Sequence, residues 1–360
     1  MKLAEFNYAL PSDRIAQRPL AERAKARMLL VERAGLSFED RTFNELPALL
    51  RGDELIVVNN TRVIPARLLG KRRGIRAESS AKRTGEFLSA EIEVLLTRQV
   101  AVNEWEALVR PGRKMRVGEQ VVFGSGELEA EIVWRGELGL RRLRFSAKGM
   151  VSEAIERLGH TPLPPYIERA DDDSDRADYQ TIFAKVSGAV AAPTASLHFT
   201  PEVLQALKAS GAELCEITLH VGLGTFQPIH EDEVEQHRMH SEAYEISESA
   251  QEQIARARST GRPVLAVGTT VVRALEDAAR KGGPDGFVVR AGKGEAEIFI
   301  RPGHEFRVVN QLLTNFHLPK SSLLVLVAAF AGRERILRAY QHAIAAGYRF
   351  YSYGDCMLIR

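Results

Sequence analysis

The stretch Val264-Leu265-Ala266-Val267-Gly268-Thr269-Thr270 joins a short apolar strand to a helix that we expect to continue to about Arg280. A strand that leads into a helix in this way is typical of α/β proteins. The chain ahead of it repeats the pattern. Thr200-Pro201 is a favourable helix start and Gly211 a favourable helix end, and residues 217–221 then alternate like a strand. The predicted fold class is therefore α/β, with a mixed or mainly parallel sheet and flanking helices.

Further segments extend this α/β body in both directions. Residues 53–58 and 298–300 are predicted to be strands. Near the C-terminus, residues 323–330 are predicted to form an apolar helix, and an amphipathic helix follows over residues 336–344.

The pattern changes between residues 66 and 150. Short runs rich in β-forming residues are separated by turn signals, and no helical period interrupts them. These runs are residues 92–96, 105–109, 120–123, 128–134 and 141–145. We expect a small antiparallel β-barrel domain at 66–150, inserted into an α/β catalytic domain made of 1–65 and 151–360. The polar stretch 71–85 is expected to be a mobile loop within the insert.

Composition argues against a membrane-spanning or secreted protein. The 360 residues are 45% hydrophobic, enough for sizeable cores, but the longest apolar run, 323–331, is far shorter than the roughly 20 residues of a membrane span. Residues 1–12 lack a long apolar run behind a basic start, so no secretory signal is expected, and Cys215 and Cys356 have no CxxC spacing. A cytoplasmic protein is the simplest expectation.

Charge is unevenly distributed along the chain. Residues 66–150 hold 17 Lys and Arg against 11 Glu and no Asp, a net charge of +6, whereas the rest of the chain has 32 against 36, a net charge of −4. The insert could be a phosphate-binding surface or merely a solvated barrel. Arg110, Arg113 and Lys114 flank the turn Pro111-Gly112, so these three cations are the predicted phosphate contacts.

Three polar clusters follow predicted strands, where open α/β sheets bind ligands. The first contains His220, Gly222, Gly224 and Thr225; its glycines lack the spacing of a dinucleotide fingerprint. The second contains Thr269 and Thr270, with Arg273 one turn on; it could bind a carboxylate or phosphate, or simply cap a helix. The third, residues 313–319, contains Thr314, Asn315 and His317; it is predicted to be a loop, and its Asn and Pro are also ordinary turn residues.

Histidines are concentrated in one part of the chain. Five of the nine lie between His198 and His240, and none lies in the basic insert. His237, His240 and Glu242 could be metal ligands, but their spacing matches no zincin motif. A hydrogen-bonding substrate site is the favoured interpretation, because histidine donates, accepts and transfers protons near neutral pH. Activity is therefore expected to need no metal.

From Phe6 to Ile359 the chain resembles the S-adenosylmethionine:tRNA ribosyltransferase-isomerases of queuosine biosynthesis. The motifs that carry the resemblance occur in order: LP (10–11), IAQ (15–17), NTRVIPARL (60–68), PLPPYI (162–167), DYQT (178–181), AAPTASLHF (191–199), TLHVGLGTF (218–226), His237 with MHSE (239–242), VGTT (267–270), TNFHLP (314–319) and YRFYSYGD (348–355). Ala26, Ser196 and Asn310 depart from the usual pattern, so we assign them no catalytic role. The 71–85 stretch is outside the resemblance.

The resemblance implies a reaction. The amine of 7-aminomethyl-7-deazaguanine at the wobble position of tRNA attacks the ribosyl moiety of S-adenosylmethionine, adenine and methionine leave, and epoxyqueuosine forms. The sulfonium acidifies the neighbouring C5′ protons. The protein must therefore supply a base for such a proton, an acid or hydrogen bond for the departing adenine, and an environment that keeps the attacking amine neutral. Metal and redox cofactors are not implied.

The resemblance also implies site residues. The side chains expected to transfer protons are His198, His220, His240 and Asp355. The residues expected to bind substrate are Thr194, Gly222, Gly224, Thr225, His237, Glu242, Thr269, Thr270, Arg273, Thr314, Asn315 and His317. From the charge of the insert, and not from the resemblance, Arg110, Arg113 and Lys114 are the expected contacts to tRNA phosphates. The expected protein is a monomer.

Two other classes of function remain open at this point. An S-adenosylmethionine-dependent tRNA methyltransferase would produce S-adenosylhomocysteine, and no GxGxG-type strand–loop motif near the N-terminus supports it. A non-catalytic RNA-binding protein would explain the basic insert, but it would leave the polar clusters without a purpose.

Overall fold

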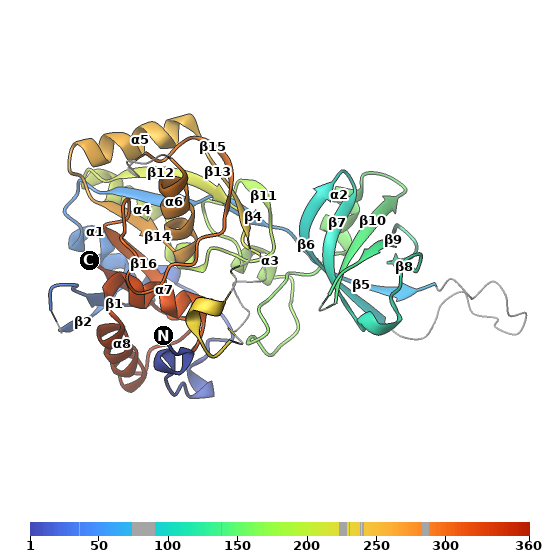
Figure 1. The fold of residues 1–360 in the computed structure, drawn as a ribbon, viewed down its shortest axis with the longest axis horizontal. Coiled ribbons are helices and arrows are strands. Elements are labelled where there is room, and N and C mark those ends of the chain that lie inside the picture. Colours follow the sequence, from blue (N-terminus) through green and yellow to red (C-terminus); the bar gives the residue numbers. More distant parts are fainter. Residues whose placement is uncertain are drawn as a thin grey trace, which may run out of the picture.

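The computed structural model describes residues 1–35, 37–73, 91–137, 139–222, 229, 231–237, 239, 241–282 and 288–360. It consists of an α/β body and a closed β-barrel beside it (Figure 1). Strand β3 (Leu55–Asn59) runs through the body toward the barrel, and the chain continues through β4 (Thr61–Val63) into the first barrel strand. The carboxyl end of β3 therefore faces the barrel.

A nine-stranded mixed sheet forms the centre of the body. Four neighbouring strands, β12, β3, β14 and β16, are parallel. An antiparallel neighbour joins them on each side, and one further pair, β1 with β17, is parallel. In order across the sheet the strands are β15 (Gly292–Ala296), β13 (Glu242–Ile246), β12 (Glu213–Leu219), β3, β14 (Val264–Val267), β16 (Gln311–Asn315), β17 (Cys356–Ile359), β1 (Arg27–Val31) and β2 (Phe38–Thr42). The predicted fold class is confirmed. A separate pair joins β4 to β11 (Val186–Ala189).

Helices cover both faces of this sheet, which is why every residue of β3 is buried. Leu55 and Val57 pack on one face together with helices α5 to α8, whereas Ile56 and Val58 pack on the other with α1 and α4. The helices of the body are α1 (Leu46–Leu49), α3 (Asp175–Asp178), α4 (Pro201–Ala209), α5 (Glu248–Ser259), α6 (Thr269–Lys281), α7 (Ser322–Ala331) and α8 (Arg333–Ala345). Thr200 caps α4 and Gly211 has φ +101, as their sequence positions predict.

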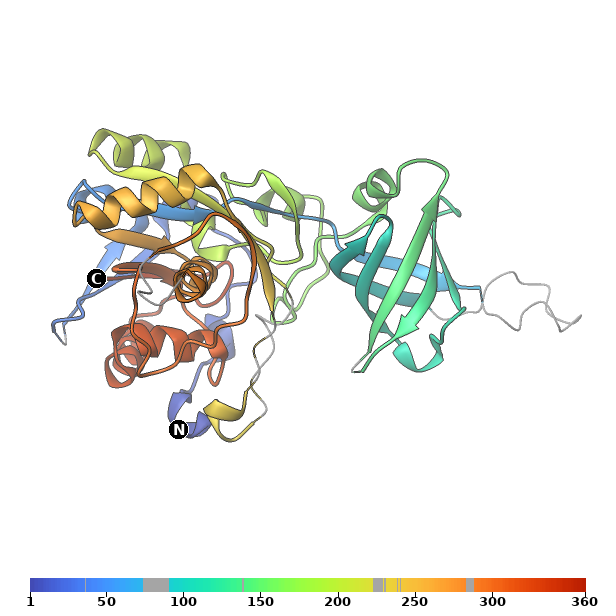
Figure 2. The same cartoon turned by 45° about the horizontal axis from the view of Figure 1, so that its top comes forward.

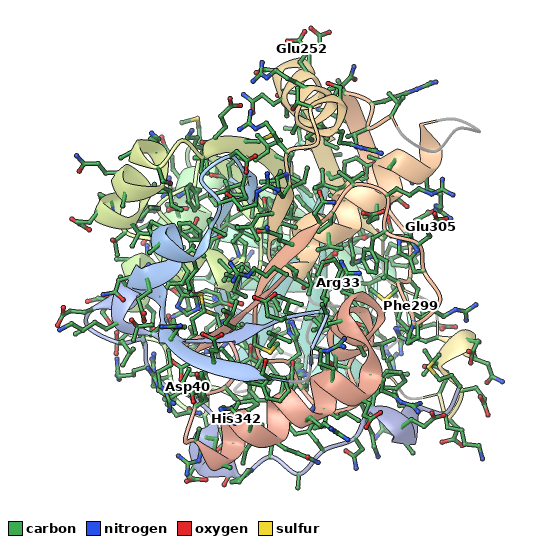
Figure 3. All side chains as sticks on the ribbon, turned by 90° about the vertical axis from the view of Figure 1, so that its left-hand side faces the viewer. Arg33, Asp40, Glu252, Phe299, Glu305 and His342 are labelled. Carbon is green, nitrogen blue, oxygen red and sulfur yellow. The ribbon has the colours of Figure 1, made fainter. Side chains whose placement is uncertain are left out.

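One side of the body faces away from the barrel. Figure 3 shows this side, with Asp40 of β2 close to His342 of α8; Nε2 of His342 lies 3.1 Å from Oδ2 of Asp40. The contact fastens the outermost strand of the sheet to the last helix. No helix in the described ranges is long and apolar enough to cross a membrane.

Six antiparallel strands close the barrel. In order around it they are β10 (Leu140–Ala147), β7 (Glu104–Arg110), β6 (Glu91–Ala101), β5 (Arg67–Arg72), β8 (Gln120–Phe123) and β9 (Leu128–Arg135). The predicted antiparallel barrel is confirmed. Helix α2 (Val151–Leu158) adds Val151, Ala154 and Ile155 to the barrel's own core. The domain boundaries at 66 and 150 stay a prediction, and we propose that the barrel unit extends through α2.

Three local predictions need correction. Residues 298–300 are not a strand, because β13 begins at Glu242, opposite Ala296, and so offers no partner beyond it. Residues 313–315 belong to strand β16, and the loop begins only after them. The strand predicted to reach residue 221 ends at Leu219. The greater part of the 71–85 stretch, from 74 onward, lies outside the described residues.

Candidate functional site

A pocket opens at the carboxyl ends of β14 and β16. Its space, including the open mouth, is about 640 Å³. The residues around it are Tyr166, Ala192, Pro193, Thr194, Ala195, Val221, Gly268, Thr269, Thr270, Thr314, Asn315, Phe316, His317, Leu318, Ser321, Leu323, Tyr351 and Ser352. Of the expected substrate-binding residues, six line it: Thr194, Thr269, Thr270, Thr314, Asn315 and His317. None of its described lining residues is Asp, Glu, Lys or Arg, so the described lining combines apolar side chains with uncharged polar ones.

The start of helix α6 forms one wall of this pocket. Gly268 has φ +93, a conformation that favours glycine, and it turns the chain from β14 directly into the helix. No side chain of the described residues caps the helix. The first backbone N–H groups, at Thr269 and Thr270, therefore have no partner within the helix and present partial positive charge to the pocket.

Polar residues at the end of β16 form a second wall. The hydroxyl of Thr314 lies 2.9 Å from Nε2 of His317, and the phenol of Tyr340 accepts the backbone N–H of His317 at 2.9 Å. Burial lowers the pKa of His317 to about 3. The ring is therefore neutral at physiological pH and can exchange hydrogen bonds without adding a charge.

Asn315 connects this wall to the buried His198. Nδ2 of Asn315 donates to the carbonyl oxygens of Tyr351 at 2.9 Å and Ser352 at 3.2 Å. Oδ1 of Asn315 lies 2.9 Å from Nε2 of His198, which is 5% exposed. His198 itself lines a smaller adjoining hollow with Arg23 and Ser352, so it contacts the pocket through Asn315.

Two tyrosines in the lining were missed by the site predictions. The rings of Tyr166 and Tyr351 lie 4.7 Å apart, and the Tyr166 hydroxyl is 2.6 Å from Oγ of Ser352. Tyr351 has φ +71, which is uncommon for a residue with a side chain and is often retained at functional sites. Both lie in motifs quoted above, PLPPYI and YRFYSYGD, but nothing local marks the backbone conformation of Tyr351.

Arg273 and Glu242 form a buried ion pair behind the pocket. Their exposed fractions are 3% and 4%, and Nη1 of Arg273 contacts Oε2 of Glu242. Arg273 also donates to the carbonyl of Ala296 at 2.8 Å, and Oε1 of Glu242 accepts from the N–H of Gly222 at 3.3 Å. Glu242 thus contacts both Arg273 and Gly222, and none of these three predicted substrate-binding residues lines the pocket.

His220 lies just beyond the end of β12, on the side of the β4–β11 pair. Its Nδ1 is 2.8 Å from the hydroxyl of Thr61, and a Cβ at Gly188 would come within 2.7 Å of its ring. Burial lowers the pKa of His220. His220 does not line the pocket, although its neighbour Val221 does.

Asp355 and His237 are also outside the pocket lining. The two carboxylate oxygens of Asp355 accept the backbone N–H groups of Arg27 at 2.9 Å and Arg349 at 2.7 Å. Burial raises the pKa of Asp355, which is 2% exposed. Nδ1 of His237 lies 3.0 Å from Oε2 of Glu231. His240, Gly224 and Thr225 lie outside the described residues.

Metal ligation was weighed for His237, His240 and Glu242. Within the part of the chain that the structure describes, no three His, Cys, Asp or Glu side chains are grouped so that they could hold a metal ion. His240 is not among those residues, so this finding concerns only His237 and Glu242 of the three.

The three cations of the insert are on the barrel surface. Arg110 ends β7, and Arg113 and Lys114 belong to a single helical turn, Gly112–Lys114. All three side chains are exposed. Arg141 is buried beneath this turn and donates to the carbonyl oxygens of Gly112 at 2.7 Å and Met115 at 2.9 Å, so the loop is braced from inside.

Known proteins resemble this chain along its whole length. A family model described as "Queuosine biosynthesis protein" matches residues 3–359. Proteins named S-adenosylmethionine:tRNA ribosyltransferase-isomerase are 52% identical over 364 residues in Solibacter usitatus and 48% identical over 359 residues in Desulfitobacterium hafniense, with both chains fully covered. A crystal structure of an S-adenosylmethionine tRNA ribosyltransferase from Thermotoga maritima, 34% identical, covers 99% of this chain and 100% of its own with a TM-score of 0.54.

Proposed function

Because this chain belongs to the queuosine biosynthesis protein family, we propose that the pocket at the ends of β14 and β16 binds S-adenosylmethionine for transfer to tRNA. The activity is transfer and isomerisation of the ribosyl moiety of S-adenosylmethionine onto 7-aminomethyl-7-deazaguanine at the wobble position, with release of adenine and methionine. Both S-adenosylmethionine and tRNA are substrates. The observation that carries the assignment of the pocket is its uncharged lining between a helix N-terminus and two tyrosine rings.

The N-terminus of α6 is the proposed subsite for the methionyl carboxylate. Unpartnered N–H groups and the positive end of a 13-residue helix favour an anion. The hydroxyls of Thr269 and Thr270 add donors in the same place, and both residues line the pocket. Arg273 supports this subsite from behind by holding Glu242, and so acts as a positioning residue.

The tyrosine rings are the proposed subsite for the sulfonium. A sulfonium has no N–H or O–H with which to donate a hydrogen bond, so attraction to an aromatic face is the natural way to hold it. The described lining offers no carboxylate as an alternative. Burial raises the pKa of both Tyr166 and Tyr351, so both rings stay neutral phenols.

Neutral histidines suit this chemistry. A protonated imidazole beside the sulfonium would repel it, whereas the neutral His317 can donate to or accept from the ribose or the departing adenine. We assign His198 the role of positioning Asn315, because it reaches the pocket through that residue. His220 and His240 remain proposed proton-transfer residues. Asp355, whose oxygens are taken by two backbone N–H groups, is proposed to order the chain around Tyr351.

The barrel is the proposed contact for tRNA phosphates, through Arg110, Arg113 and Lys114. Their exposure and the net charge of +6 on residues 66–150 support this. We further propose a monomer that acts in the cytoplasm, where tRNA is available.

One assay tests the function. Purified protein is incubated with S-adenosylmethionine and with tRNA that carries 7-aminomethyl-7-deazaguanine, carries unmodified guanine, or is absent. We expect free adenine and methionine, equal in amount to modified tRNA, in the first reaction alone. S-adenosylhomocysteine as the product would identify a methyltransferase, and tRNA binding without turnover would identify an RNA-binding protein.

A further inference from the structure

The barrel carries one exposed tryptophan. Trp134 is the second-last residue of β9, and its side chain is on the outside of the barrel, 43% exposed. The chain's other tryptophan, Trp105, is 8% exposed and packs in the barrel core. A large aromatic side chain so exposed on a small barrel has no role in its core.

The ring of Trp134 is held in a defined position. The guanidinium of Arg142, on the neighbouring strand β10, lies 5.6 Å from its centroid, and Arg142 is in turn paired with Glu106 at 3.3 Å. A Cβ at Gly136 would come within 2.5 Å of the ring, so the tryptophan occupies space that the glycine leaves free. Trp134 is therefore a supported, partly exposed aromatic surface.

Exposed cations are concentrated in the 110–118 loop and at Arg135, which follows Trp134 in the chain. Arg110, Arg113, Lys114, Arg116 and Arg135 are all exposed, and among the described residues none has a carboxylate within 4.0 Å. Elsewhere on the barrel, arginines commonly have acidic partners. Such pairs are Arg67 with Glu93, Arg72 with Glu119, Arg73 with Glu129, Arg98 with Glu106 and Arg144 with Glu104.

Hydrogen bonds join the segments that carry these residues. Nη2 of Arg141 donates to the carbonyl of Gly112 at 2.7 Å. The N–H of Gly118 donates to the carbonyl of Ile132 at 2.8 Å, and the N–H of Val109 donates to the carbonyl of Gly139 at 3.3 Å. The 110–118 loop and the β9–β10 hairpin therefore form one end of the barrel, the lower end in Figure 2. We call this end the Trp134 surface.

We propose that the Trp134 surface binds single-stranded RNA, with an unpaired tRNA base stacked on Trp134 and the adjoining phosphates on the cations at the same end of the barrel. A base needs a flat aromatic or guanidinium face to stack on, and unpaired cations favour a phosphate backbone over a protein surface of mixed charge. This inference rests on tRNA being the substrate. It goes beyond the proposed phosphate contacts by stating that the barrel recognises an unpaired nucleotide.

The two tryptophans provide a direct measurement. The protein is titrated with an RNA stem-loop that has an unpaired loop, and with a fully paired RNA duplex of the same number of phosphates, while tryptophan fluorescence and binding are followed. We expect the stem-loop to quench Trp134 and the duplex to bind more weakly without quenching. Trp105, buried in the core, should keep its emission in both titrations.

Variants separate stacking from charge. Trp134→Ala should weaken stem-loop binding by about 5- to 100-fold, and Trp134→Phe should retain most of it. A matched control is Val102→Ala, since Val102 is 86% exposed at another turn of the barrel. Affinity for S-adenosylmethionine should be unchanged in all three variants. Trp105 emission and the melting temperature report whether each variant is folded.

Three results would overturn the inference. One is unchanged stem-loop affinity in a folded Trp134→Ala variant. Another is equal quenching by the paired duplex. The third is competition by polyglutamate as strong as that by the stem-loop, which would mark a surface for acidic protein segments. Because adenine release is measured separately, a failure here leaves the proposed reaction standing, whereas absence of adenine release refutes the reaction itself.

Discussion

Nε2 of His198 lies 2.9 Å from Oδ1 of Asn315, a residue 117 positions further along the chain. The Nδ2 group of Asn315 donates to two backbone carbonyls, at Tyr351 and Ser352, and carbonyl oxygens only accept. Oδ1 must therefore face His198, and the proton must be on Nε2. His198 is thus a neutral donor that fixes the side-chain amide of Asn315. That amide in turn holds the backbone of Tyr351 in its left-handed conformation.

This arrangement predicts a pH-dependent stability. Burial lowers the pKa of His198 to about 4, against about 6.5 in an unfolded chain. Above pH 6.5 the contribution of neutral His198 to the free energy of unfolding is fully present. As the pH falls toward 4, the histidine takes up a proton in the unfolded chain but not in the folded chain, so this contribution is lost. The free energy of unfolding should drop by about 3 kcal/mol over this window from His198. His198→Asn should flatten this pH dependence of the unfolding free energy, measured by urea unfolding at several pH values.

Replacing His220 should impair chemistry and leave binding of S-adenosylmethionine intact. His220→Ala is expected to lower turnover by roughly 10²- to 10⁴-fold, the usual effect of losing a general acid or base. Because the ring lies outside the pocket lining, the dissociation constant of S-adenosylmethionine should hardly change. The matched control is Thr61→Val, which removes only the hydroxyl 2.8 Å from Nδ1. Near-normal turnover in folded His220→Ala would refute the assignment.

The Arg273–Glu242 pair should behave as a structural unit. Arg273→Met leaves a buried carboxylate without its cation, which costs about 3–5 kcal/mol of unfolding free energy. The double variant, Arg273→Met with Glu242→Leu, should lose clearly less unfolding free energy than the sum of the losses in the two single variants, because no charge is then buried without its partner. Chemical denaturation of the four proteins measures the coupling. Additive losses would mean that the two residues act independently.

Tyr351 should contribute to binding of the positive charge on S-adenosylmethionine. Tyr351→Leu is expected to weaken S-adenosylmethionine about 5- to 30-fold, since a desolvated cation–π contact contributes about 1–2 kcal/mol. Tyr351→Phe keeps the ring and should bind within a few-fold of the wild type. Calorimetry with S-adenosylhomocysteine, which lacks the sulfonium charge, is the control. If both ligands weaken equally, the ring has a packing role only.

Neutralising the barrel loop should change the salt dependence of tRNA binding. Cations that bind phosphates release counterions, so the logarithm of the affinity falls linearly with the logarithm of salt concentration. Changing Arg110, Arg113 and Lys114 together to Gln should flatten that slope by up to about one unit for each phosphate that is no longer neutralised. The control set consists of Arg73, Arg98 and Arg144, each already paired with a glutamate. Equal slopes for the two variants would show that the loop does not bind phosphates.

Local sequence signals predicted the elements and the edge of the sheet where the pocket lies. Apolar runs marked β3 and β14, Thr200 and Gly211 marked the ends of α4, and short β-rich runs marked the barrel. The polar residues at the ends of β14 and β16, and just after them, line the pocket. Carboxyl ends of neighbouring parallel strands meet at one edge, so residues just after such strands gather there whatever their distance along the chain.

Partners of individual side chains could not be predicted in this way. His198 with Asn315, Arg273 with Glu242 and the left-handed backbone of Tyr351 depend on which strands are neighbours, and the order β12, β3, β14, β16 across the sheet is not the order along the chain. By itself the sequence determined the α/β class, several of the strands and helices, the presence of a β-barrel in the insert and the family that the chain resembles, because those properties depend on local patterns. Only the tertiary structure decided which predicted residues line the pocket and which brace it, because burial and hydrogen bonding join residues that no local pattern connects.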